Sequence, residues 1–170
     1  MAKKGALETA ATQHLAQLNI PFAVHQFESS SSPVDDLHSP TYARDAAAIL
    51  GVDPHRFFDM WVVKLTHAEN VVVAIPATTV LDLAVVAASV GRDHAEFASD
   101  KRAAKFTGEK DDSRSVLALP EETDVLIDIS VFDHQTVFVA AGRPGYAIEL
   151  SSQDLVNVTG ARTAPIVRYL

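Results

Sequence analysis

Apolar residues recur along this chain in two periods, which divide it into interleaved helices and strands. Apolar positions spaced every three or four residues predict helices at residues 6–18, 42–50, 79–89, 96–106 and 151–158. Runs rich in β-branched and aromatic residues predict strands at residues 22–27, 57–65, 71–75, 125–129, 136–140 and 146–150. Short turns join several of these strands, which indicates antiparallel hairpins. The pattern therefore predicts an α+β fold: a mixed, largely antiparallel sheet or partly open barrel surrounded by helices.

The same pattern predicts one domain over residues 1–170, because neither a repeat nor a linker interrupts it. Two polar stretches are expected to be loops, residues 29–40 and residues 107–119. The first is long for a compact domain, and long loops often cover a site or are disordered.

Composition excludes several kinds of chemistry. The chain has no cysteine, which rules out disulfides, thiolate nucleophiles and cysteine-based zinc sites. Its seven histidines show no metal-ligand spacing, and no phosphate-binding glycine motif is present, so we expect no cofactor and no metal. No signal peptide and no apolar run near the ~20 residues of a membrane span are evident, which predicts a cytoplasmic protein without a membrane partner.

Charge argues against strong, autonomous binding of nucleic acid. The formal net charge is −8, and an acidic protein repels a polyanion at long range. A basic cluster exists, but acidic residues are interleaved with it, so we interpret it as a solvated surface; its members are Lys101, Arg102, Lys105, Lys110 and Arg114.

Asp59 is the anomaly of the pattern, since it is an acid inside an apolar strand. Strand alternation places Asp59 and Trp61 on one face, with Phe58, Met60 and Lys64 on the other. A buried carboxylate needs a partner or a raised pKa. Asp59 is therefore either a site acid or base, or an aspartate at the edge of the sheet that is partly wet or paired to an arginine. Trp61 is expected to be core or pocket wall, not a base-stacking platform, because no second exposed aromatic residue accompanies it in the sequence.

Several segments, in order and spacing, resemble the YbaK/EbsC family, the free-standing relatives of the editing domain of bacterial prolyl-tRNA synthetases. They include Ile20-Pro-Phe-Ala-Val-His25, Val72-Val-Ala-Ile-Pro-Ala77, Thr107-Gly108, Val139-Ala-Ala-Gly142-Arg-Pro-Gly145 and Ile148-Glu-Leu150. The resemblance implies a trans-acting deacylase that hydrolyses the ester of mischarged tRNA, such as cysteinyl- or alanyl-tRNA for proline, and so serves translation fidelity. The implied partners are the 3′ end of aminoacyl-tRNA and an aminoacyl-tRNA synthetase.

Two departures from the family pattern bear on the site that the resemblance implies. The family has a lysine, usually followed by threonine, where this chain has Asp59 and Met60, and a carboxylate repels phosphate. The family has glycines in the loop before its serine, where an ungapped comparison places Asp112 and Ser113 before Ser115. The implied catalytic residues are Asp59 and Ser115. The implied substrate-binding residues are Met60, Thr107, Gly108, Ser113 and Gly142.

Three functions remain open from the sequence. The chain is an aminoacyl-tRNA deacylase, a non-catalytic relative that binds a small amine-bearing ligand in the same pocket, or an enzyme acting on another small ester or amide. In the first, Asp59 accepts a hydrogen bond from the substrate's α-ammonium or orients water. In the second, it selects an amine over a phosphate.

Overall fold

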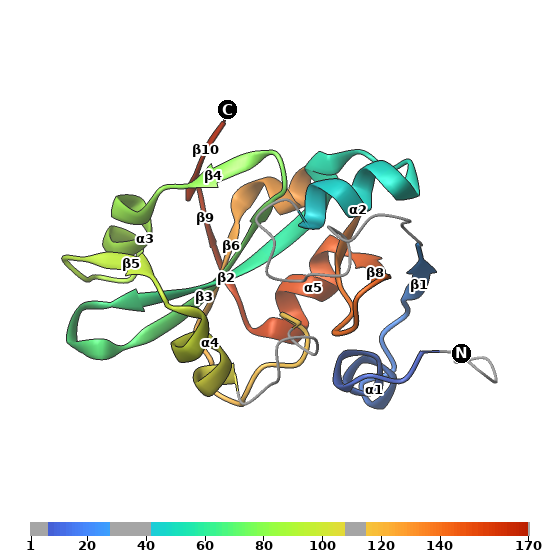
Figure 1. The fold of residues 1–170 in the computed structure, drawn as a ribbon, viewed down its shortest axis with the longest axis horizontal. Coiled ribbons are helices and arrows are strands. Elements are labelled where there is room, and N and C mark those ends of the chain that lie inside the picture. Colours follow the sequence, from blue (N-terminus) through green and yellow to red (C-terminus); the bar gives the residue numbers. More distant parts are fainter. Residues whose placement is uncertain (1–6, 28–41, 108–114, 170) are drawn as a thin grey trace.

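A mixed sheet runs through the molecule, with helices on both of its faces (Figure 1). The computed structural model describes residues 7–27, 42–107 and 115–169. The helices are α1 (Ala10–Gln17), α2 (Tyr42–Leu50), α3 (Leu83–Ser89), α4 (Asp100–Thr107) and α5 (Ser152–Thr159). The strands are β1 (Ala23–Gln26), β2 (Phe57–Leu65), β3 (Asn70–Pro76), β4 (Thr79–Leu81), β5 (Ala95–Phe97), β6 (Val125–Asp128), β7 (Thr136–Ala140), β8 (Tyr146–Ser151), β9 (Arg162–Ala164) and β10 (Val167–Tyr169).

The large sheet has the order β1-β8-β7-β2-β3-β6-β9, with β5 also paired to β2. The pairs of β8 with β1 and β7, and of β2 with β3 and β5, are antiparallel. The pairs β2/β7, β3/β6 and β6/β9 are parallel. The predicted mixed, largely antiparallel α+β fold is confirmed.

Strand alternation in β2 separates two hydrophobic clusters. Phe58 and Val62 join the cluster on the side covered by α1, α4 and α5. Val63 and Leu65 join the cluster on the other side, against α3. Burial on both faces explains why β2 reads as a nearly continuous apolar run, and it makes a carboxylate in that run costly unless the site compensates it.

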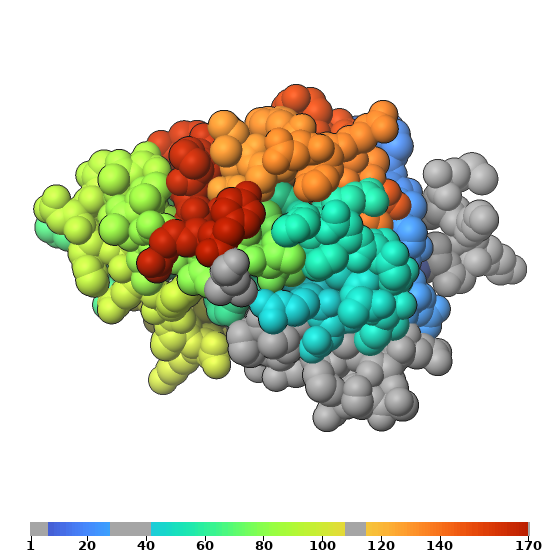
Figure 2. Space-filling model, turned by 90° about the horizontal axis from the view of Figure 1, so that it is seen from above, coloured from blue at the N-terminus to red at the C-terminus, as the bar shows by residue number. Residues whose placement is uncertain are grey.

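The expectation of one helix over residues 79–89 was right for Leu83–Ser89, which form α3, and wrong at its start. Thr79–Leu81 form strand β4, and Asp82 is the N-cap of α3, where its carboxylate accepts a hydrogen bond from the Val85 backbone N–H at 3.3 Å. β-Branched Thr79 and Val80 favour a strand, and β10 supplies the antiparallel partner. Figure 2 shows this C-terminal segment, in dark red, lying on the surface beside the green segment that contains β4.

The expectation of a helix over residues 96–106 was also wrong at its start. Ala95–Phe97 form β5, which pairs antiparallel with the end of β2. The helix begins only at Asp100, after Ser99, whose hydroxyl accepts a hydrogen bond from the Arg102 backbone N–H at 3.1 Å. Ser99 and Asp100 are a helix-start signal, so the boundary was available in the sequence.

Asp128 fixes the C-terminal strands, which the sequence pattern did not predict. Its side chain is buried and accepts hydrogen bonds from the backbone N–H groups of Ser130 at 3.1 Å and Ile166 at 3.0 Å. These bonds tie the segment between β9 and β10 to the end of β6.

The predicted loop at residues 29–40 lies outside the described residues.

Candidate active site

A split in the large sheet creates the candidate site. β2 pairs with β7 only at Phe57 and Phe58, and with β5 only from Val63 to Leu65. Between these two ladders, no strand of the described residues pairs with β2 along this edge. A cavity of about 100 Å³ occupies the gap.

Met60 presents its backbone to this cavity. The Phe57 carbonyl accepts from Ala77 N–H on the β3 side, whereas the Val62 carbonyl accepts from Ala98 N–H on the opposite side. Backbone groups alternate in direction along a strand, so the N–H and C=O of Met60 point the same way as those of Val62. The split therefore exposes a backbone donor and acceptor that a continuous sheet would use in its ladder.

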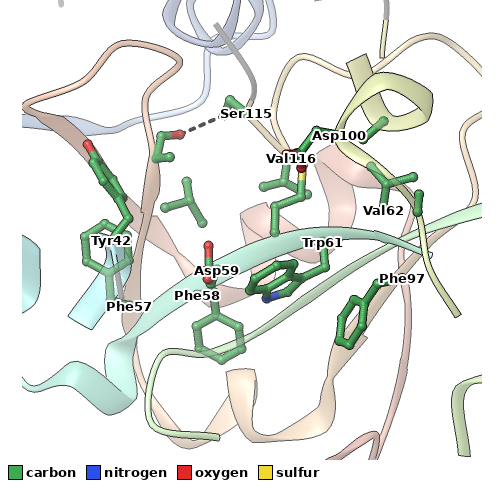
Figure 3. A pocket seen from close by; sticks show the side chains of 15 residues that line it. Tyr42, Phe57, Phe58, Asp59, Trp61, Val62, Phe97, Asp100, Ser115 and Val116 are labelled. Atoms are coloured by element: carbon green, nitrogen blue, oxygen red, sulfur yellow. Dashed lines mark hydrogen bonds between the residues drawn. The ribbon is translucent and has the colours of Figure 1, made fainter. Parts of the chain in front are cut away.

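Ser115 helps to keep the ladder from closing. Continuing the β2/β7 register by one step would join the Met60 N–H to the Ala140 carbonyl. Instead, the buried Ser115 hydroxyl donates to that carbonyl at 2.8 Å and accepts from the Leu117 backbone N–H at 3.2 Å (Figure 3). Ser115 thus occupies the acceptor on β7 and leaves the Met60 N–H free for another acceptor.

The Asp59 carboxylate accepts a hydrogen bond from the free Met60 N–H. Asp59 is half-buried, and the close-up view places its side chain in the middle of the cavity, between Tyr42 and Phe57 on one side and Trp61 on the other (Figure 3). Burial raises the pKa of Asp59 from its ordinary value of 3.8 to about 7, while a hydrogen bond from the Met60 backbone N–H acts in the opposite direction. No arginine or lysine within residues 7–27, 42–107 and 115–169 forms an ion pair with it, so the predicted alternative of an arginine partner is not seen there.

Most side chains that line the cavity are apolar, and the two charged groups among the described lining residues are carboxylates. Asp59 lies inside, and the exposed Asp100 from the first turn of α4 lies at the rim. The described lining contains no lysine, arginine or histidine, and Lys64 lies away from the cavity, 3.6 Å from the Glu96 carboxylate. The remaining described lining residues are Tyr42, Phe57, Phe58, Met60, Trp61, Val62, Phe97, Ala98, Ala103, Ser115, Val116, Val139 and Ala140.

The structure brings together three of the residues expected from the sequence, Asp59, Met60 and Ser115. Thr107 is buried at the end of α4 and donates its hydroxyl hydrogen to the Ala103 carbonyl at 3.0 Å, and it is not among the lining residues. Gly142, with a positive φ of 86°, lies in the turn after β7 and is likewise not among them. Gly108 and Ser113 lie outside the described residues.

Phe97 is an aromatic lining residue that the sequence pattern missed. Its side chain is 48% exposed, and its ring lies 5.4 Å from that of Trp61 in an edge-to-face arrangement. The expectation that no second exposed aromatic residue accompanies Trp61 was therefore wrong. The error followed from assigning Phe97 to a helix, because β5 places it on the same side of the sheet as Trp61.

A second polar cluster lies outside the cavity and is satisfied internally. Glu149 accepts hydrogen bonds from His25 at 2.9 Å, Arg56 at 3.1 Å and Thr136 at 2.5 Å. The hydrogen bond from Thr136, then those from His25 and Arg56, hold the pKa of Glu149 below its ordinary value against partial burial. Because its members satisfy one another, this cluster fastens β1, β7 and β8 together and offers no free group for chemistry.

Metal and membrane signals are absent from the part of the chain that the structure describes. No group of three or more histidine, cysteine, aspartate or glutamate side chains lies close enough there to hold a metal ion. No described helix has the length and apolarity to cross a bilayer.

Comparison with known proteins places the chain in a family. The model of the aminoacyl-tRNA editing domain matches residues 38–158, so the chain belongs to the aminoacyl-tRNA editing domain family. The suspected YbaK/EbsC relationship is thereby confirmed. A curated relative is "Putative Cys-tRNA(Pro)/Cys-tRNA(Cys) deacylase EbsC" from Enterococcus faecalis, 24% identical over 164 residues that cover 96% of each chain.

Solved structures agree on the fold. A crystal structure of a protein described as hypothetical has a TM-score of 0.79 at 19% identity and covers 94% of this chain and 99% of its own. A crystal structure of "a putative trans-editing enzyme for prolyl tRNA synthetase" has a TM-score of 0.74 at 17% identity and covers 95% of this chain and 99% of its own. At such identities these likenesses establish the fold alone.

Proposed function

We propose that this protein is an aminoacyl-tRNA deacylase whose general base is Asp59. The observation that carries the proposal is a half-buried carboxylate, with its pKa raised to about 7, inside a cavity at an unpaired strand edge. A general base works best when its pKa lies near the operating pH, because it is then both deprotonated and basic enough to accept a proton. Family membership supplies the substrate class, the ester that links an amino acid to tRNA.

The proposed reaction is hydrolysis of that ester by water. Asp59 removes a proton from water, and the water oxygen bonds to the carbonyl carbon. The bond from that carbon to the ribose oxygen then breaks, and the ribose oxygen takes up the proton that Asp59 removed from water, which releases the free amino acid and tRNA and restores the Asp59 carboxylate. The Met60 backbone N–H, which donates to the Asp59 carboxylate, helps to orient that carboxylate for this step. Ser115 acts as a positioning residue, because its buried hydroxyl already has a donor role and an acceptor role within the protein.

The size of the cavity supports small aminoacyl groups as substrates. Its volume is about 100 Å³. An apolar cavity of about 150 Å³ is known to accommodate benzene. We therefore expect alanyl, seryl and cysteinyl esters to enter and aromatic aminoacyl groups to be excluded.

A second candidate function is a non-catalytic relative that binds a small amine. It is favoured by the charge of the lining, in which two carboxylates stand without a cation among the described lining residues. Asp59 also takes the position at which the YbaK/EbsC resemblance places a lysine. In this alternative, the cavity retains its shape but holds an ammonium group against Asp59.

A deacylation assay with alanyl-, cysteinyl- and seryl-tRNA separates the two functions. The deacylase proposal predicts that wild type hydrolyses at least one of these esters, that Asp59→Ala does not, and that exposed Asp133→Asn behaves as wild type. If wild type is inert and Asp59→Lys gains activity, the non-catalytic relative is the better description. If Asp59→Ala retains full activity, the assignment of the base is wrong.

The proposal extends to partner and compartment. Because the net charge is −8, we propose that an aminoacyl-tRNA synthetase supplies most contacts to the tRNA body, and that the protein acts in the cytoplasm. We also propose that residues 1–170 form one editing domain.

A further inference from the structure

An aromatic corner stands at the mouth of the cavity, formed by Trp61 on β2 and Phe97 on β5. Their ring centroids are 5.4 Å apart with an angle of 61° between the planes. The ladder pairs Val63 with Phe97, so Trp61 and Phe97 are diagonal neighbours on one face of the sheet. Strand pairing thus fixes both rings, and Figure 3 shows them together on the side of the cavity beyond Asp59.

This corner is open, although its rings are of the kind that proteins usually bury. Phe97 is 48% exposed and Trp61 is partly exposed. Single exposed apolar residues are ordinary, but two fixed rings that both line a cavity offer a surface to a planar ligand. Because both rings lie at the mouth, they can contact a planar part of a ligand that remains outside the cavity while a smaller part of the same ligand enters it.

The negative charge at the cavity indicates which part of a ligand can lie at this corner. The Asp59 and Asp100 carboxylates line the cavity without a cation among the described lining residues, so a phosphate is repelled from it. A neutral aromatic ring carries no such penalty. Nucleobases stack on aromatic side chains independently of their sequence, because every base has a π face.

We infer that the Trp61–Phe97 corner binds the adenine base at the 3′ end of tRNA by stacking. The inference rests on the proposed function, since the scissile ester is attached to the ribose of that terminal adenosine. With the ester at Asp59, the base lies about one ribose away. Trp61 is two residues along the strand from Asp59, about 7 Å at ~3.3 Å per residue, which matches that separation. The phosphate attached to the ribose then remains in solvent, away from both carboxylates.

The first test is a titration with adenosine, monitored by tryptophan fluorescence. Trp61 is the only tryptophan in the chain, so its emission reports directly on the corner. We expect saturable quenching by adenosine, and a dissociation constant raised about 5- to 100-fold in Phe97→Ala, the range that loss of one stacking partner produces. Exposed Asp133→Asn serves as the control and is expected to bind as wild type does.

Two outcomes overturn the inference. One is quenching that does not saturate with adenosine, or that Phe97→Ala leaves unchanged. The other is equal quenching by alanine methyl ester, which has an amine but no base and would identify the corner as a cation–π site instead.

A second variant keeps the test sound if Phe97→Ala fails to fold. Phe97→Leu preserves apolar bulk and removes the ring, and its fold is checked by thermal melting. We expect Phe97→Leu to raise the KM for alanyl-tRNA by a larger factor than the KM for alanine methyl ester, which has no base to stack. Equal effects on both esters would make Phe97 part of the aminoacyl pocket and contradict the inference. Adenosine binding requires no hydrolysis, so an inert protein that binds adenosine disproves only the deacylase proposal.

Discussion

At Asp59, a single side chain carries both a cost to the fold and the proposed chemistry. Its carboxylate is half-buried in an apolar strand and has no cationic partner in the described part of the chain. The Met60 N–H that bonds to it is available because the sheet is split at this point. The charged form is therefore disfavoured but not excluded, which leaves Asp59 near its midpoint at neutral pH.

The first residue-level prediction concerns stability against pH. Because folding raises the pKa of Asp59 from 3.8 to about 7, the folded state binds more protons than the unfolded state between these values. The contribution of Asp59 is full below pH 4 and is lost as the pH rises through 7. The wild-type free energy of unfolding should then fall, relative to Asp59→Asn, by at most about 1.4 kcal/mol per pH unit across this window. Urea unfolding at pH 4, 6 and 8 measures the difference, and parallel curves for the two proteins would refute it.

Glu149 provides a second prediction with the opposite sign. Its pKa is lowered from 4.5 by hydrogen bonds from Thr136, His25 and Arg56, so its stabilising contribution is full above 4.5 and is lost as the pH falls. Glu149→Gln should cost about 1–2 kcal/mol at pH 7, a range reduced for the partial exposure of the cluster. The cost should shrink in acid, and exposed Asp133→Asn should show neither effect in the same urea titrations.

At the scale of elements, the ladders that stop on either side of Met60 define the site. Sequence periodicity predicted β1, β2, β3, β6, β7 and β8, each of which is four residues or longer. It could not predict that β2 would pair with β7 at one end and β5 at the other, since pairing between distant segments leaves no local signal. The short strands β4, β5, β9 and β10 failed for the same reason: they are three residues each and are recognisable mainly by their partners.

The candidate site was predictable to a similar extent. Asp59 stood out by parity alone, and the family resemblance supplied Met60 and Ser115. Phe97 was missed through the misassigned helix, and Asp100 was part of that error. Ser99 before Asp100 was the available signal, and using it as a helix start would have released residues 95–97 to form a strand.

The role of Ser115 in keeping the β2/β7 ladder open leads to a prediction for Ser115→Ala. Ser115→Ala leaves the Ala140 carbonyl and the Leu117 N–H without their partner, which should cost about 1–3 kcal/mol in thermal or urea unfolding. Because Ser115 positions the split and does not touch the reacting atoms, kcat should fall while the apparent pKa of activity stays in place. A shift of that pKa, or a covalent intermediate trapped on Ser115, would contradict a positioning role.

For the whole molecule, the proposed function requires an acidic protein to act on a polyanion. Because the net charge is −8 and carboxylates line the cavity, we expect stacking, shape and a partner synthetase to hold the tRNA. The protein should need only the last nucleotide and its amino acid inside the site. This agrees with the small cavity and the open aromatic corner at its mouth.

The dependence of the KM for alanyl-tRNA on salt concentration measures how many tRNA phosphates the protein contacts. Proteins that make six to ten phosphate contacts lose about 10³–10⁵ in affinity between 50 and 200 mM salt. Here we expect the KM for alanyl-tRNA to change less than about tenfold over that range, in assays with the isolated protein. A steep increase would indicate several phosphate contacts and contradict the proposed division of labour with a synthetase.

The pH–rate profile of alanyl-tRNA deacylation is the decisive test of whether Asp59 is the base for ester hydrolysis. We expect wild-type kcat/KM, after subtraction of spontaneous hydrolysis, to rise with pH through an inflection near 7 and then to level off. Asp59→Asn should lose about 10²–10⁴ of the rate together with this inflection, whereas Asp133→Asn retains both. An unchanged inflection in Asp59→Asn, or an unchanged rate, would show that Asp59 is not the base.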